Sequence, residues 1–184
     1  MKTFFCFFLF MYSLVFSETA IDLLKLLEES VVKDGFHVVY DDYDNNTRWN
    51  GKESFKAFTM RCKGTPTIGY GITDKKILSK LKISDYEAEQ YLIAEANKTR
   101  RHILNLVKIK LTHYQREAMV SFVYNIGITN FKKSTLLKKL NENRLSDVPK
   151  EMLRWKYKTV KGEKVVCDGL VKRRIKEIEF FNGK

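Results

Sequence analysis

Two capping boxes in the second half of the chain constrain its fold more than any other feature of the sequence. Each box places a Ser or Thr three residues before a Glu or Gln, so the two residues can satisfy each other's backbone N–H groups at a helix start. The boxes are Ser84-Asp85-Tyr86-Glu87 and Thr112-His113-Tyr114-Gln115. Apolar residues at helical spacing follow both, and Gly127 lies where the second helix should end. We therefore predict a long helix after Ser84 and another between Thr112 and Gly127.

The sequence downstream of Gly127 keeps the helical period. Its apolar spacing predicts helices over residues 132–140, 148–155 and 169–181, the last with Asp168 as its N-cap. The C-terminal half should therefore be almost entirely helical.

The segment upstream of Ser84 mixes helical and strand patterns. Residues 19–33 carry apolar side chains at helical spacing before Gly35, which predicts a helix. Residues 36–40 favour a short strand, residues 41–63 are polar and indicate an irregular excursion, and glycines two apart in residues 65–73 favour a tight strand or hairpin. The expected fold class is α+β, with a small β-hairpin lobe near the N-terminus joined by a long helix to a mostly helical C-terminal lobe.

The N-terminus has the pattern of a signal peptide. Lys2 precedes an apolar run of about 13 residues, and short side chains near Ser17 suit a cleavage site. The run is shorter than the roughly 20 residues that cross a bilayer, and no later stretch is apolar enough to do so. We predict removal of residues 1–17, secretion, no stable membrane insertion after signal removal, and one folded domain over residues 18–184. Retention as an uncleaved anchor is the alternative.

The charge balance points to an anionic partner. The chain has 34 Lys and Arg residues against 22 Asp and Glu, a formal net charge of +12. Such a surplus favours nucleic acid, a membrane surface or an acidic polymer such as the bacterial envelope. The positive residues are spread along the chain rather than gathered in a tail, and no recognised nucleic-acid-binding module is present. We therefore predict no nucleic-acid partner.

No motif for a cofactor or metal is present. The sequence lacks a Walker loop, a dinucleotide-binding glycine fingerprint and HExxH, and its 3 scattered histidines form no zinc pattern. Asp42, Asp44, Asn46 and Glu53 stand at the first, third, fifth and twelfth positions of a calcium loop, but Thr47 occupies the sixth, where the turn needs glycine. We predict neither cofactor nor metal.

The sequence alone does not decide two covalent modifications, a disulfide and glycosylation. Cys62 and Cys167 could form a disulfide in an exported chain or remain unpaired, because spacing supplies no geometry. Asn45 and Asn97 begin sequons for glycosylation.

Carboxylates are the remaining candidates for chemistry. Glycoside hydrolysis uses two of them: one gives a proton to the leaving oxygen, and the other stays ionised and positions a water or attacks the sugar. Glu28, among apolar neighbours, suits the first role, and Asp42, in a polar stretch, suits the second. The competing interpretation is that Glu28 belongs to an exposed helix face and Asp42 to a solvated turn.

Four sequence blocks resemble the phage-type lysozymes of glycoside hydrolase family 24. Residues 64–73 (GTPTIGYGIT) are similar to the family's TIGYG-type hairpin, and residues 111–127 to its QxxALxSFxxNxG stretch. Residues 131–141 resemble FxxSTLLxxLN, and Arg154-Trp155 with residues 169–177 resemble RW followed by GLxxRRxxE. The blocks keep their order and together cover most of residues 64–181.

The resemblance implies an endo-acting muramidase that hydrolyses the β-1,4 bond between N-acetylmuramic acid and N-acetylglucosamine in bacterial peptidoglycan. We predict that the chain is a monomer. The resemblance assigns the catalytic roles to Glu28 as acid and to Asp42 and Thr67 as the pair that orients a water. Asp34, which precedes Gly35 as the family's Glu precedes its Gly, is the alternative acid. Ile72 stands where the family commonly has His, so a lysozyme-like peptidoglycan-binding protein with impaired catalysis is the alternative function.

Overall fold

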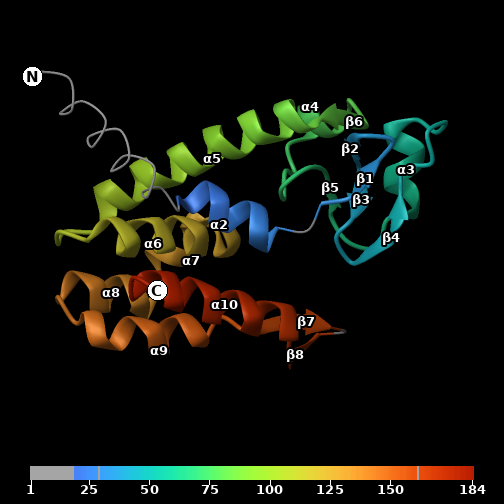
Figure 1. Cartoon of the computed structure of the whole chain (residues 1–184). Coiled ribbons are helices and arrows are strands. Elements are labelled where there is room, and N and C mark those ends of the chain that lie inside the picture. Colours follow the sequence, from blue (N-terminus) through green and yellow to red (C-terminus); the bar gives the residue numbers. More distant parts are fainter. Residues whose placement is uncertain (1–18, 29, 161) are drawn as a thin grey trace, which may run out of the picture.

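The computed structural model describes residues 19–28, 30–160 and 162–184, and shows two lobes joined by the long helix α5 (Figure 1). The predicted signal peptide, residues 1–17, lies outside the described residues. Among the residues that the structure describes, no helix is both long and apolar enough to cross a membrane. The arrangement confirms the predicted α+β class, with the small β-containing lobe preceding α5 and most of the helical lobe following it.

The β-lobe contains two small antiparallel sheets. The first has the order β1 (Val32–Lys33), β2 (Phe36–Val38), β6 (Lys82–Ser84), and the second β4 (Asp44–Arg48), β3 (Tyr40–Asp41), β5 (Pro66–Thr67). Two short helices, α3 (Phe55–Arg61) and α4 (Lys75–Leu78), complete the lobe. Its small core includes Val39, Phe58, Ile68 and Ile83. Ile72, which forms a β-bridge with Ile68, packs in the same cluster.

The helical lobe is built around one central helix. In this helix, α6 (His113–Ile126), every residue from Glu117 to Val123 is buried, because helices pack against it on several sides. The other helices of the lobe are α2 (Ala20–Leu27), the C-terminal part of α5 (Asp85–Leu106), α7 (Ile128–Lys132), α8 (Thr135–Asn141), the 3-10 turn η1 (Leu145–Asp147), α9 (Val148–Leu153) and α10 (Asp168–Phe181). A two-stranded hairpin, β7 (Tyr157–Val160) and β8 (Glu163–Val166), separates α9 from α10.

Both predicted capping boxes are confirmed. The Glu87 amide donates to Ser84 Oγ at 3.2 Å and the Ser84 amide donates to the Glu87 carboxylate at 3.0 Å. The second box has the same two bonds, at 3.2 and 3.0 Å. Gly127 ends α6 with φ +82°, a conformation that favours glycine. Because caps act over three or four residues, they are visible in the sequence.

The prediction of a helix over residues 19–33 is wrong in its second half. Helix α2 ends at Leu27, and β1 and β2 then form a hairpin in which Val32 pairs with His37. The turn is Asp34-Gly35, with φ of +52° and +77°. An Asp-Gly pair flanked by β-branched residues is a hairpin signal, and here it outweighs the helical spacing of the valines.

Other boundaries also differ from the predictions. The excursion at residues 41–63 contains β4 and α3, the latter capped by Ser54, whose Oγ accepts a bond from Ala57 N at 3.3 Å. The helix expected over residues 132–140 is split into α7 and α8 by the N-cap Ser134. Cys167, not Asp168, is the N-cap of α10. The β7–β8 hairpin was not expected at all.

Cys62 and Cys167, the cysteines among the described residues, are both free, so of the two alternatives the unpaired one holds. Cys62 ends α3 in the β-lobe and its thiol donates to the Phe58 carbonyl, whereas Cys167 begins α10 in the helical lobe.

Candidate active site

Glu28 lies at the junction between the two lobes. It is the C-cap of α2, held by a bond from its amide to the Leu24 carbonyl at 2.8 Å. Its extended backbone (φ −91°, ψ 115°) turns the chain away from the helix. The side chain is 16% exposed, and its Oε1 accepts a bond from Arg173 Nη1 at 2.7 Å. A carboxylate at the edge of solvent with one fixed cation is an arrangement that can exchange a proton with a substrate.

Arg173 is itself held by a buried network of alternating charges. Its Nε donates to Glu177 at 3.1 Å, and Glu177 also accepts a bond from Ser121 Oγ at 2.8 Å. Arg174 forms an ion pair with the other oxygen of Glu177 and donates to Asn125 Oδ1 at 2.6 Å. Burial lowers the pKa of Arg174 to about 10, so the side chain is still cationic at neutral pH. Each buried charge therefore faces an opposite one, and the network fixes the guanidinium that holds Glu28.

The glycine-containing hairpin of the β-lobe, residues 65–73, approaches Glu28 closely. A Cβ added at Gly71 would lie 3.1 Å from Glu28 Oε2, and Gly71 has φ +82°, so glycine is required both for space and for conformation. Tyr124 of α6 donates its hydroxyl to the Tyr70 carbonyl at 2.6 Å. Burial, together with the nearby Glu28 carboxylate, raises the pKa of Tyr124, so this donor keeps its proton. The bond attaches the hairpin to the helical lobe beside Glu28.

The backbone of Thr65 brings Asp42 and Thr67 together. Its amide donates to Asp42 Oδ1 at 2.5 Å, and its carbonyl accepts bonds from the Asp42 amide at 3.2 Å and from Thr67 Oγ1 at 3.0 Å. Thr67 is buried and pairs with Tyr40 across β3 and β5, while Asp42 is exposed in the turn that follows β3. Asp42, in the turn after β3, and Thr67, in β5, are thus both bonded to the backbone of Thr65.

Asp41 is a supporting residue that the sequence did not distinguish from Asp42. Its carboxylate is buried and accepts bonds from the amides of Tyr43 at 3.0 Å, Lys63 at 2.6 Å and Gly64 at 2.9 Å. These bonds fold the chain around Gly64 back onto β3 and so position Thr65. Gly64 itself has no room for a side chain, because a Cβ there would overlap Asp42 and Asp41. Gly64 is the sequence signal from which its contact with the two aspartates could have been predicted.

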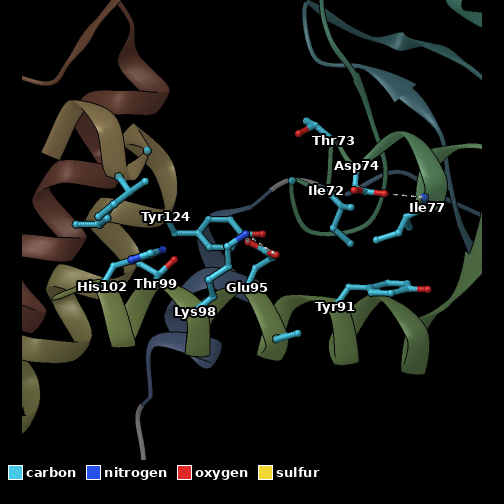
Figure 2. Close-up of a pocket in the computed structure, with 15 residues that line it drawn as sticks. Ile72, Thr73, Asp74, Ile77, Tyr91, Glu95, Lys98, Thr99, His102 and Tyr124 are labelled. Atoms are coloured by element: carbon cyan, nitrogen blue, oxygen red, sulfur yellow. Dashed lines mark hydrogen bonds and ion pairs between the residues drawn. The ribbon is translucent and has the colours of Figure 1, made fainter. Parts of the chain in front are cut away.

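A cleft of about 480 Å³ lies between the lobes (Figure 2). The hairpin and α4 contribute one wall, including Thr73 and Asp74, and α6 with α7 contributes the opposite wall, including Tyr124. One face of α5 forms the floor, with the side chains of Tyr91, Glu95, Lys98, Thr99 and His102. Gly71 and Tyr124 line the cleft and both neighbour Glu28, so the cleft opens beside that carboxylate. Glu28, Asp42 and Thr67 are themselves not among the residues that line it.

The remaining predicted site residues are placed differently. Asp34 is exposed in the β1–β2 turn, and no contact brings it to the cleft in the part of the chain that the structure describes. Within the same described residues, no group of three or more His, Cys, Asp or Glu side chains could hold a metal ion. Glu53, considered above as a calcium ligand, instead pairs with Arg61 at 2.6 Å, which lowers its pKa.

Several known proteins resemble this chain in sequence. The family model for phage lysozyme matches residues 50–177. An endolysin of Acyrthosiphon pisum secondary endosymbiont phage 1 is 36% identical over 128 residues, which cover 70% of this chain and 86% of the relative. The chain belongs to the phage lysozyme family. The match confirms the predicted enzyme class, a lysozyme-type glycoside hydrolase.

Solved structures agree with this family assignment. An endolysin from Escherichia coli O157:H7 phage FAHEc1 superposes with a TM-score of 0.70 at 30% identity, covering 90% of this chain and 91% of the other. The muramidase domain of SpmX from Asticaccaulis excentricus superposes with a TM-score of 0.69 at 25% identity, covering 90% and 95%. The predicted lysozyme-like fold is thereby confirmed. An endolysin of Bacillus phage PZA is longer, and this chain, 34% identical to it, spans 52% of its length.

Proposed function

We propose that this protein is an endo-acting muramidase that hydrolyses the β-1,4 bond between N-acetylmuramic acid and N-acetylglucosamine in peptidoglycan. The observation that carries the proposal is the position of Glu28: it pairs with a buried arginine of the helical lobe and touches the hairpin of the lobe that bears Asp42 and Thr67. The names endolysin and muramidase among the relatives supply the substrate class.

In the proposed mechanism, Glu28 gives its proton to the glycosidic oxygen of the departing sugar. The carboxylate that results is compensated by Arg173, which is already 2.7 Å away. Asp42 accepts a proton from a water that it orients together with Thr67 Oγ1, and this water attacks the anomeric carbon from the opposite face of the ring. One C–O bond breaks as another forms, and the anomeric configuration is inverted.

Glu28 is favoured over Asp34 as the acid for two structural reasons. Asp34 is exposed in a turn at positive φ, which is a common place for aspartate in a hairpin without further function. Glu28 lies beside the cleft, where its carboxylate pairs with Arg173 and lies next to Gly71 of the β-lobe. A general acid contributes about 10²–10⁴-fold to the rate, so only one of the two residues should show an effect of that size.

The test is the release of reducing ends from purified peptidoglycan. We expect Glu28→Gln and Asp42→Asn to lower kcat by at least about a hundredfold, and the matched variant Asp34→Asn to leave it within about twofold. Loss of activity in Asp34→Asn with an active Glu28→Gln would reverse the assignment. A wild-type protein that sediments with peptidoglycan but releases no reducing ends would establish the non-catalytic alternative.

Export of the protein through its N-terminal segment remains part of the proposal. Peptidoglycan lies outside the cytoplasmic membrane, and the apolar run after Lys2 matches a signal peptide. N-terminal sequencing of the secreted product should begin at residue 18. We also propose that the chain acts as a monomer, which sedimentation velocity would test.

A further inference from the structure

The proposed hydrolysis of a glycan assigns no role to the β7–β8 hairpin. Seven of its eight strand residues are exposed and the eighth is half-buried, so neither face of the hairpin packs on the body of the lobe. A two-stranded hairpin in water is only marginally stable by itself. It is closed at its base by a bond from the Cys167 amide to the Lys156 carbonyl at 2.9 Å, immediately before α10. Figure 1 shows it at the end of α10 opposite the C-terminus.

One face of the hairpin and the outer face of α9 form a shallow hollow of about 630 Å³. It is lined by Lys150, Leu153, Arg154, Lys156, Tyr157 and Lys164, which we call the α9–hairpin patch. Tyr157 and Lys164 lie on the same face of the hairpin, because Tyr157 pairs with Val166 and Thr159 pairs with Lys164. The inner face of α9, with Val148 and Met152, is buried and fixes the patch to the core.

The patch is cationic, and one of its cations, Arg154, pairs with a carboxylate. Four of its six described lining residues carry a positive charge and none is acidic. This carboxylate, Glu151, accepts a bond from Thr135 Oγ1 at 2.6 Å and one from Arg154 at 3.2 Å, so it offsets the charge of Arg154. Lys150 and Lys164 are exposed, and Lys156 lies 5.7 Å from the centre of the Tyr157 ring. Three lysines are therefore available to bind anions as point charges.

The apolar members of the patch indicate what kind of anion fits. Leu153 is 39% exposed and Tyr157 is 47% exposed, and both lie among the cations. A ligand that alternates negative groups with short carbon segments could contact both kinds of side chain. The apolar side chains of the hairpin are divided between its two faces, with Tyr157 and Val166 on one and Val165 on the other, which does not provide the single apolar face that a bilayer requires.

We propose that the α9–hairpin patch binds a phosphodiester-linked anionic wall polymer of the poly(glycerol phosphate) type. This inference rests on the proposed function, because such a polymer is attached to the peptidoglycan that the cleft would receive. The patch adjoins the start of α10, and Arg173 of the same helix holds Glu28. Polymer bound there keeps the protein on the wall between successive cuts.

The experiment compares Gram-positive walls that carry poly(glycerol phosphate) with the same walls after acid extraction of that polymer. The variant is Lys150→Gln/Lys156→Gln/Lys164→Gln, and the control Lys132→Gln/Lys133→Gln/Lys138→Gln removes the same charge from exposed lysines of α7, α8 and the residue between them. We expect the first variant to bind intact walls about tenfold more weakly at low salt, and the control to bind them like the wild type. Both should bind extracted walls equally and release reducing ends from them at the wild-type rate.

Two results would overturn the proposal. One is an equal loss of binding in both triple variants, which would mean that net charge alone matters. The other is stronger patch-dependent binding to phosphatidylglycerol vesicles or to single-stranded RNA than to the polymer. Failure of the proposed muramidase function gives a result distinct from these two. The wild type would then release no reducing ends from extracted walls, however strongly it binds to intact walls.

Discussion

Replacing Gly64 with Ala gives a test of how the β-lobe positions its carboxylates. The backbone of Gly64 does not have a positive φ, so alanine is allowed there, and the effect is purely one of space. The added methyl group would lie 2.6 Å from Asp41 Oδ1 and 2.7 Å from Tyr43 Cβ, and closer still to Asp42 Oδ1. Ordinary contact requires a displacement of about 0.8 Å.

The structure also indicates which atoms can move. Asp41 is buried and held by three backbone amides, whereas Asp42 is exposed and held through Thr65. We expect the loop around residue 64 to shift outward and carry Asp42 with it. The free energy of unfolding should fall by about 2 kcal/mol, from overpacking and a weakened bond to Asp41. A displacement near 1 Å in a catalytic group lowers kcat roughly a hundredfold.

The assay is reducing-end release together with thermal unfolding, and Gly169→Ala is the control. A Cβ at Gly169 meets only Cys167 Sγ at 3.9 Å, and the residue lies within α10, so alanine should maintain or raise stability and leave activity unchanged. For Gly64→Ala we expect Tm to fall by about 4–8 °C. A Gly64→Ala enzyme with wild-type kcat would refute the role given to Asp42, and an unchanged Tm would refute the steric argument.

Two further predictions concern contacts between distant segments. Tyr124→Phe removes the bond to the Tyr70 carbonyl and should lower the free energy of unfolding by about 1 kcal/mol, measured by urea denaturation. Burial raises the pKa of Glu117, but bonds from Arg100 and the Ala20 amide lower it further, and the net shift is downward. The stability from Glu117 is therefore present above its ordinary pKa of 4.5 and lost as the pH falls below it. Unfolding of Glu117→Gln should depend less on pH between 5 and about 3 than that of the wild type; equal slopes would contradict this.

Local signals in the sequence predicted the helical lobe well. Ser84, Thr112 and Gly127 act on backbone groups within a few residues of themselves, so the starts of α5 and α6 and the end of α6 could be found without knowledge of the rest of the chain. The Asp34-Gly35 turn is equally local, and the error over residues 28–33 came from giving helical spacing more weight than turn chemistry.

The candidate site could be predicted only in part. The sequence blocks identified the family and suggested Glu28, Asp42 and Thr67, but two acids competed for one role. The structure separates the two by their surroundings: Glu28 meets Arg173 from 145 positions away, and Asp34 remains in a solvent-exposed turn. No spacing rule connects residues 28 and 173, because their contact depends on how α2 and α10 pack against α6.

The chain by itself determines where its main helices begin and end, its α+β class and its family, because caps, turns and sequence blocks depend on neighbouring residues. Tertiary structure alone decides the partner of Glu28, the contact of Gly64 with two aspartates, the free state of Cys62 and Cys167 and the cationic hollow beside the β7–β8 hairpin. Each of these joins residues that are distant in sequence, and a distance in space is fixed only when the lobes have packed.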